Sequence, residues 1–267
     1  MKNKLMGAVT AAAFSLSAFV GSVAHAANID LAFIMDASGS VGSTNFNNAM
    51  DSLADALEAN IPVGTTDTYR IGVVTFSNTA QLTTLRTINS AQDLADTAND
   101  IRNQSFIGST TNYRAAFDLV RTSFAGLGAL GDSSIVNMMT DGEPFGGLDP
   151  NGQAVIGRDA LKNAGWDSLS FESVTNGADN AFLSTLGFDA LGDGATIIGG
   201  PGAITDPLND AFVLPIADFG TDYDIAIDQK VRRIVTPGVI PLPAALPLLG
   251  GGVLFLGLIG RRRKAAA

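Results

Sequence analysis

Two continuous runs of apolar residues and two similar segments, separated by longer amphipathic stretches, limit the folds that this chain of 267 residues can adopt. The continuous runs cover residues 29–36 and 70–77, and the similar segments cover residues 133–141 and 168–174. A strand that is apolar at nearly every position is typical of a parallel sheet, because helices cover such a sheet on both faces. In an antiparallel sheet with one solvent-exposed face, apolar and polar residues would alternate along each strand instead. The runs therefore predict buried parallel strands.

Two further segments complete the predicted sheet. Residues 212–217 form a shorter apolar run, in which Pro215 favours the end of a strand or an edge position. Residues 80–85 alternate polar and apolar side chains after a turn at Asn78, a pattern typical of an antiparallel edge strand. The Gly-rich segment 191–210 is expected to be a long surface loop.

Amphipathic stripes between the runs predict helices. Apolar residues recur every three or four positions in two segments, which is the spacing of one helical face. These stripes consist of Met50, Leu53, Leu57 and Ile61 in one helix and Tyr113, Phe117, Val120 and Phe124 in another. Ser90 and Asp93 form a capping-box pattern that opens a third helix, and residues 153–164 and 217–235 fit two more. Strands that alternate with helices predict an α/β fold with a doubly wound, mostly parallel sheet flanked by helices and an antiparallel edge strand, as in Rossmann-like proteins.

The two ends of the chain have the composition of export signals. Residues 1–26 combine two lysines, an apolar run and an Ala-His-Ala cleavage site, which predicts a secretory signal peptide. Residues 239–267 combine a proline-rich start, an apolar stretch from 242 to 260 that is long enough to span a bilayer, and a basic end. We therefore expect a single exported domain in residues 27–238.

The predicted domain is strongly acidic. All 26 acidic residues lie within it, whereas six of the 16 basic residues lie in the two signals, so ten remain and the net charge is about −16. A charge of this sign disfavours nucleic acids and anionic lipid surfaces as partners. It is compatible with solubility outside the cell and with the binding of cations.

Two missing residue types exclude most familiar hydrolytic chemistry. The chain has no cysteine, and its only histidine, His25, lies in the predicted signal peptide. A Ser-His-Asp triad, a thiolate nucleophile and a metal site built on histidine or cysteine are therefore excluded from the domain. Lys162 and Lys230 remain as possible lysine bases.

Side chains with oxygen atoms follow the predicted strands at one edge of the sheet. Three separate segments carry these residues, which are Asp36, Ser38, Ser40, Thr110, Thr111 and Asp141. Ligands of open parallel sheets bind at the carboxyl ends of the strands, near the point where the strand order reverses. Taken singly, each segment is an ordinary turn or N-cap sequence. The three together predict one site.

Together these segments resemble the von Willebrand factor type A domain and its metal-ion-dependent adhesion site. The family pattern is D-x-S-x-S, a downstream threonine and a T-D-G aspartate. The corresponding residues of this chain are Asp36, Ser38, Ser40, Thr111 and Asp141. Thr111 is preferred to Thr110 because the sequence TNYRAAF keeps the family's spacing from the threonine to the next helix. The resemblance extends from residue 28 to about residue 235, and it is weakest in the segment after Pro144.

The resemblance implies a divalent cation at these residues, Mg²⁺ or alternatively Mn²⁺ or Ca²⁺. In the family the serines and the threonine coordinate the cation directly, and the aspartates act mostly through water. Neutral hydroxyls leave the cation much of its charge, so that its remaining position attracts a carboxylate. The implied function is adhesion, without enzymatic activity, to an extracellular protein or glycan that offers a carboxylate. Two alternatives stay open: a metal-assisted enzyme acting on matrix polymers, and a structural matrix protein whose cation only stabilises the fold.

The C-terminal segment resembles the PEP-CTERM sorting signals in their VPLPA variant. The motif stands here as IPLPA, from Ile240 to Ala244, and is followed by the apolar span and a cluster of three arginines and a lysine. The resemblance implies a bacterial protein of the cell envelope, cell surface or extracellular matrix that an exosortase processes. The membrane would hold it through this segment at least transiently.

Overall fold

A computed structural model describes residues 26–175 and 177–236 of the chain. The predicted signal peptide, except for its last residue, and the predicted sorting signal lie outside the described residues, so both stay predictions. Within the described ranges, no helix has the length and apolar character that a membrane span requires.

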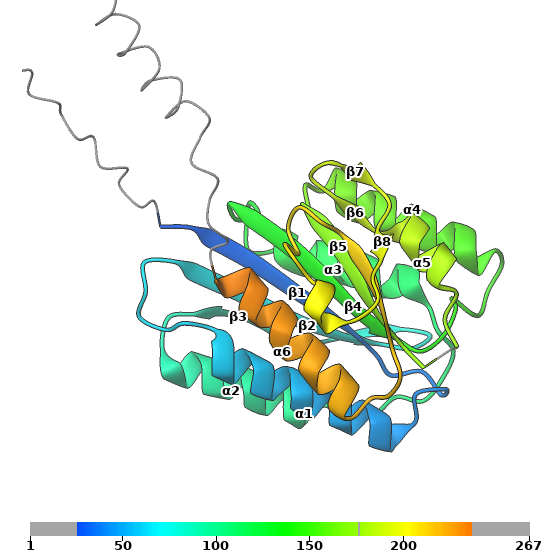
Figure 1. The fold of residues 1–267 in the computed structure, drawn as a ribbon, viewed down its shortest axis with the longest axis horizontal. Helices are drawn as coiled ribbons and strands as arrows, with labels where there is room; N and C mark the ends of the chain where they lie inside the picture. Colours follow the sequence, from blue (N-terminus) through cyan, green and yellow to red (C-terminus); the bar gives the residue numbers. More distant parts are fainter. Residues whose placement is uncertain (1–25, 176, 237–267) are drawn as a thin grey trace, which may run out of the picture.

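The described chain forms a nine-stranded sheet between two layers of helices, which confirms the predicted α/β class (Figure 1). The strands are β1 (Asn28–Asp36), β2 (Thr68–Phe76), β3 (Ala80–Ile88), β4 (Ser133–Thr140), β5 (Ser168–Val174), β6 (Phe188–Asp189), β7 (Gly192–Asp193), β8 (Thr196–Ile197) and β9 (Phe212–Ile216). The helices are α1 (Ser43–Asn60), α2 (Ala91–Arg102), α3 (Tyr113–Ala125), α4 (Pro150–Asn163), α5 (Asn180–Leu186) and α6 (Thr221–Val235), with a short 3₁₀ turn at Pro201–Ala203.

The strand order of the sheet reverses at β1. This strand pairs in parallel with β2 on one side and with β4 on the other. β5, β9 and β8 continue the parallel pairing beyond β4, and β3 runs antiparallel to β2 at the edge, as predicted. The carboxyl ends of β1 and β4 are therefore neighbours at the topological switch point, where ligands of such sheets bind.

Some elements differ from the sequence predictions. α4 begins at Pro150, three residues earlier than predicted, because the side chain of Asp149 caps it and proline suits its first turn. α6 begins at Thr221, four residues later than predicted. The segment 191–210 is mostly irregular, as expected, but it also contains β7, β8 and the 3₁₀ turn. The sequence pattern does not predict these pieces, because strands of two residues show no period and are held by pairing with β6 and β9.

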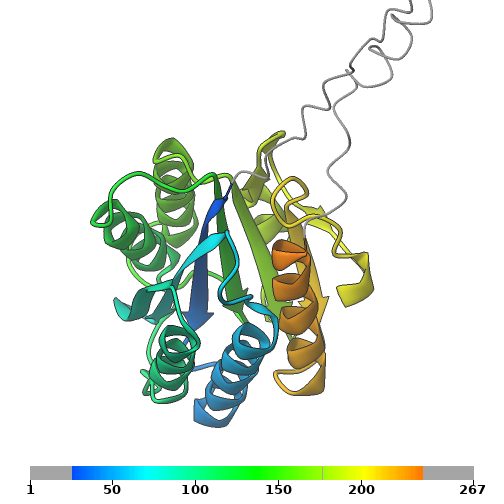
Figure 2. The same cartoon turned by 90° about the vertical axis from the view of Figure 1, so that its left-hand side faces the viewer.

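Each face of the sheet carries its own hydrophobic core, because successive side chains of a strand point to opposite faces. In β1, Leu31, Phe33 and Met35 face the layer of α1, α2 and α6. Ala32 and Ile34 face the layer of α3, α4 and α5. Figure 2 shows α2, α1 and α6 side by side along one face. These two layers fix the ends of β1 and β4, from which the loops with the predicted site residues emerge.

Candidate metal centre

Asp36, the last residue of β1, has a fully buried side chain whose two carboxylate oxygens are both engaged. Its Oδ1 accepts a hydrogen bond from the backbone N–H of Ser38 at 2.8 Å. This bond makes a tight turn directly after the strand, as aspartates commonly do. Its Oδ2 accepts a hydrogen bond from the hydroxyl of Thr140 at 2.7 Å, which links the ends of β1 and β4. Asp36 therefore organises the backbone around the site.

Ser38, Ser40 and Asp141 meet beside Asp36. The two serine Oγ atoms lie 3.1 Å apart, and the Ser40 hydroxyl donates to Asp141 Oδ1 at 2.8 Å. Ser38 is buried and Ser40 is exposed, so the group opens to solvent on one side. We call Asp36, Ser38, Ser40 and Asp141 the oxygen cluster. The structure thus brings four of the five predicted site residues together through hydrogen bonds.

Thr111, the fifth predicted residue, lies in the loop before α3, and its hydroxyl is not part of the hydrogen bonds that join the oxygen cluster. Backbone bonds hold this loop against both neighbouring loops: Gly39 N–H donates to the Ser109 carbonyl, and Phe145 N–H donates to the Thr111 carbonyl, each at 2.8 Å. Thr111 is 6% exposed. The hydroxyl of Thr110, the alternative residue, lies against the loop that follows β4.

Thr140 and Tyr113 support the oxygen cluster, although the sequence analysis does not assign either of them to the site. The Tyr113 hydroxyl donates to the carbonyl of Gly142 at 2.5 Å and lies 3.1 Å from the Thr140 hydroxyl oxygen. Thr140 in turn donates to Asp36. This relay holds the loops after β1 and β4 together. Thr140 can be associated with the site from the sequence, because it directly precedes Asp141. Tyr113 cannot, because the sequence shows it only as one residue of an apolar helical stripe.

Burial disfavours the charged form of both carboxylates of the oxygen cluster. Burial raises the pKa of Asp36 to about 6, the hydrogen bonds from Ser38 and Thr140 oppose the rise, and the charge of Asp141 adds to it. Burial also raises the pKa of Asp141, against the hydrogen bond from Ser40. Among the described residues, no lysine or arginine contributes to either shift. The cluster therefore lacks a positive partner of its own.

The atoms of the oxygen cluster suit a hard divalent cation. Hydroxyl and carboxylate oxygens are the donors that Mg²⁺, Mn²⁺ and Ca²⁺ prefer. In the part of the chain that the structure describes, no three His, Cys, Asp or Glu side chains gather as metal ligands, so a site here depends on its hydroxyls. The serine hydroxyls contact each other and Asp141, and a cation between them would replace these contacts. Both the donor types and the uncompensated negative charge fit such an ion.

Both lysines that the sequence offers as bases are engaged elsewhere. Lys162 forms an ion pair with Asp193 at 2.6 Å. Lys230 is buried beside Glu172, with 3.5 Å between Nζ and Oε1. These contacts are structural, and they give the enzymatic alternative no support.

Comparisons with known proteins agree with this architecture. The family model of the von Willebrand factor type A domain matches residues 30–188. The solved structure of proximal thread matrix protein 1 from the mussel byssus is similar, with 18% identity, coverage of 79% of this chain and 46% of that chain, and a TM-score of 0.56. A von Willebrand factor type A structure from Catenulispora acidiphila has 15% identity, coverage of 78% and 42%, and a TM-score of 0.52. A comparison with curated proteins found no match.

Another structure of the mussel protein is described as having a zinc-occupied MIDAS motif. Its identity to this chain is 18%, it covers 78% of this chain and 48% of that chain, and its TM-score is 0.51. At such identities the likeness shows the fold alone. The match spans less than half the length of each of these three solved chains.

Proposed function

Because this chain belongs to the von Willebrand factor type A domain family, we propose that it is an exported adhesion or matrix-binding protein that acts through a divalent cation. The proposed cation site consists of Asp36, Ser38, Ser40, Thr111 and Asp141. The oxygen cluster carries this proposal, because two buried carboxylates and two serine hydroxyls meet there without a positive side chain. Mg²⁺ is the proposed ion, and Mn²⁺ and Ca²⁺ are the alternatives.

Each residue has a distinct proposed role. The hydroxyls of Ser38, Ser40 and Thr111 would hold the cation directly. Asp36 already accepts a protein hydrogen bond at each carboxylate oxygen, which favours a role through water for this aspartate. Asp141 would act in the same way. Bound among neutral hydroxyls, the cation would supply a positive centre for a carboxylate of the partner.

The partner is proposed to be an extracellular protein or glycan that offers such a carboxylate. The net charge of about −16 on residues 27–238 would repel an acidic surface in the absence of a cation. The exposure of Ser40 favours this function over a purely stabilising cation, because a partner can approach the cluster from solvent. The proposal assigns no catalytic residue.

The predicted signals in residues 1–26 and 239–267 support the proposed localisation in a bacterial envelope or at the cell surface. An exosortase-type enzyme is the proposed processing partner. Deleting residues 239–267 should release the exported protein into the soluble fraction, because this deletion removes the apolar span. Cell fractionation measures the outcome. Recovery of the shortened protein in the inner membrane would contradict the proposed role of residues 239–267.

The proposed binding function is tested with the full-length protein and extracts of bacterial envelope or matrix. Binding is measured with Mg²⁺, with EDTA, and after the carboxyl groups of the extract are amidated. Ser40→Ala removes one direct ligand and should weaken both Mg²⁺ binding and extract binding by about tenfold. Ser123→Ala, near the far end of α3, is the matched control and should change neither. Binding that survives both EDTA and amidation would refute the proposal and favour the structural alternative.

A further inference from the structure

The loop between β4 and α4 displays large apolar side chains beside the oxygen cluster. Phe145 is 66% exposed and Leu148 is 92% exposed, and both follow Asp141 closely in the sequence. The structure buries most of the other large apolar side chains that it describes. Exposed apolar groups gathered at one place mark interaction surfaces. This loop is therefore a candidate contact surface next to the proposed cation.

The two ends of this loop are tied to the rest of the fold. Phe145 N–H donates to the Thr111 carbonyl at 2.8 Å. At the other end, Asp149 adopts a left-handed backbone conformation with φ 51°, accepts a hydrogen bond from Gly152 N–H at 3.1 Å, and precedes Pro150 at the start of α4. Such a conformation is unfavourable for a residue other than glycine, and it persists where the surrounding structure determines it. The apolar side chains are thus presented on a constrained frame.

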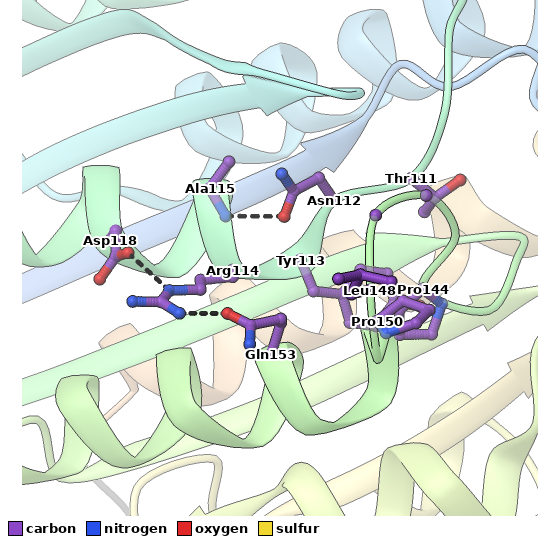
Figure 3. A pocket seen from close by; sticks show the side chains of 12 residues that line it. Thr111, Asn112, Tyr113, Arg114, Ala115, Asp118, Pro144, Leu148, Pro150 and Gln153 are labelled. Carbon is purple, nitrogen blue, oxygen red and sulfur yellow. Dashed lines mark hydrogen bonds and ion pairs between the residues drawn. The ribbon is translucent and has the colours of Figure 1, made fainter.

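A cavity of about 410 Å³ lies between this loop and the beginnings of α3 and α4 (Figure 3). Its volume falls in the range of ligand-binding pockets. Pro144, Leu148 and Pro150 form an aliphatic part of its wall. Thr111 also belongs to the wall, so the cavity adjoins the proposed cation site.

Three polar side chains of the wall are paired with one another. Arg114 donates to Gln153 Oε1 and lies 3.4 Å from the carboxylate of Asp118, and Figure 3 shows these three side chains joined at one end of the cavity. Since these groups satisfy one another, this end does not require a second charged group from a ligand. The aliphatic part of the wall is therefore the part of the cavity that we expect a ligand to contact.

We propose that the partner is a protein segment in which an acidic side chain stands next to a large apolar one. The acidic side chain would reach the cation, and the apolar one would enter the cavity against Pro144, Leu148 and Pro150. A uronate polysaccharide would bring the carboxylate but would leave Leu148 in water. The inference rests on the proposed function and specifies its partner.

The test compares immobilised peptides with the sequences Gly-Gly-Asp-Leu-Gly-Gly and Gly-Gly-Asp-Ser-Gly-Gly, together with uronate oligosaccharides. Binding of the full-length protein is measured in Mg²⁺ and in EDTA. We expect the Asp-Leu peptide to bind about tenfold more tightly than the Asp-Ser peptide, because burial of one large apolar side chain corresponds to a factor of this order. Equal binding of the two peptides, or tighter binding of the oligosaccharides, would overturn the inference.

Two matched variants separate this surface from the cation site. Leu148→Ser should remove most of the preference for the Asp-Leu peptide and leave the Mg²⁺ affinity unchanged. Leu191→Ser changes a leucine that is 84% exposed between β6 and β7, and it should affect neither quantity. An unchanged preference in Leu148→Ser, or a Leu148-dependent binding to phospholipid vesicles that persists in EDTA, would overturn the inference while Mg²⁺ titration still supports the proposed function. Failure of the wild-type protein to bind Mg²⁺ would overturn both.

Discussion

Two clusters of polar side chains in this protein, each with buried carboxylates or amines, differ in how their charges are balanced. In the oxygen cluster, Asp36 and Asp141 are like charges whose pKa values burial raises. A second group, which we call the lysine cluster, lies beneath α6 and consists of Asn137 of β4, Glu172 of β5 and Lys230 of α6. Lys230 Nζ lies 3.5 Å from Glu172 Oε1 and donates to Asn137 Oδ1.

The lysine cluster contains its own positive charge. Burial raises the pKa of Glu172 and lowers the pKa of Lys230 to about 8, and each charge opposes the shift of the other. Lys230 also lies over the ring of Phe212, 4.6 Å from its centroid. Both charged side chains are fully buried. The pair is therefore closed to solvent and has its counter-charge within the fold.

This difference shows that burial of charge alone does not identify a binding site. Structural ion pairs also perturb pKa values, as the lysine cluster demonstrates. The sign of the neighbouring charges and the access from solvent distinguish a candidate binding site from a structural ion pair. Two acids with hydroxyls lie at the open ends of β1 and β4 without a counter-charge, which is the arrangement that the proposed cation would balance. An acid and a base between a helix and the sheet balance each other.

Removing the positive charge of the lysine cluster should have the largest effect on stability. Lys230→Met leaves Glu172 buried without a counter-charge and should lower the free energy of unfolding by about 3–5 kcal/mol. Arg232→Met, which breaks an exposed ion pair with Asp228, is the control and should cost less than about 1 kcal/mol. Urea denaturation followed by the fluorescence of Trp166 measures both.

The double variant Lys230→Met/Glu172→Gln separates charge from packing. It should recover a large part of the loss, because no unpaired charge stays buried. An equal loss in the single and double variants would show that packing, rather than charge balance, holds this cluster together.

Neutralising a carboxylate of the oxygen cluster should have the opposite effect in the absence of a cation. Asp36→Asn removes one of two buried like charges and keeps an oxygen that can accept from Ser38. In EDTA at pH 7 it should therefore raise the free energy of unfolding by about 2 kcal/mol. The same change should abolish the rise in Tm that we expect Mg²⁺ to produce in the wild-type protein. Thermal denaturation with and without Mg²⁺ measures both effects. A lower stability in EDTA would show that the protein itself compensates the charge of Asp36.

The stability of the cation-free protein should also depend on pH through Asp36. Its pKa is about 6 in the folded protein against an ordinary value of 3.8, so the folded state binds this proton more tightly than the unfolded state. The destabilisation is fully present above about pH 6 and is lifted as the pH falls towards 4. From pH 7 to 4.5 in EDTA, the wild-type protein should gain at most about 2 kcal/mol relative to Asp36→Asn.

Saturating Mg²⁺ should reverse this pH trend, because protons then compete with the cation for the site. Urea denaturation at each pH, with the variant as reference, removes the contribution of other titrating groups. The same pH dependence in the wild type and the variant would assign the effect to a different residue.

The parts of the fold that the sequence predicts well are those buried on both faces of the sheet. The predicted strand segments place the ends of β1, β2, β4 and β5 within two residues of their observed positions, because most side chains of these strands are buried. β6, β7 and β8 are too short to show a period. α5 is a helix of only seven residues, too short to produce a clear stripe. Pairing and packing in the folded chain, rather than local sequence, determine these elements.

The oxygen cluster is predictable because its motif and the fold agree. Asp36 ends β1 and Asp141 follows β4, and these strands are neighbours at the switch point, so sequence order and sheet topology lead to one place. The lysine cluster is not predictable in this way, because nothing in the sequence pairs Glu172 with Lys230. The sequence signals of this cluster are only single polar residues within predicted strands, a glutamate in β5 and an asparagine in β4. The exposure of Leu148 is likewise visible only once the loop has its folded shape.

The choice between Thr110 and Thr111 is the finest distinction within the proposed cation site. Figure 3 shows the side-chain oxygen of Thr111 turned away from the other labelled residues of the cavity, whereas the hydroxyl of Thr110 lies against Gly146. Thr111→Ala should therefore lower the affinity for Mg²⁺ by about tenfold, because it removes a direct ligand. Thr110→Ala should leave the affinity unchanged. Calorimetric titration of both variants with Mg²⁺ measures the difference. A larger loss in Thr110→Ala would assign the ligand to Thr110 and would mean that the loop before α3 changes its conformation when the cation binds.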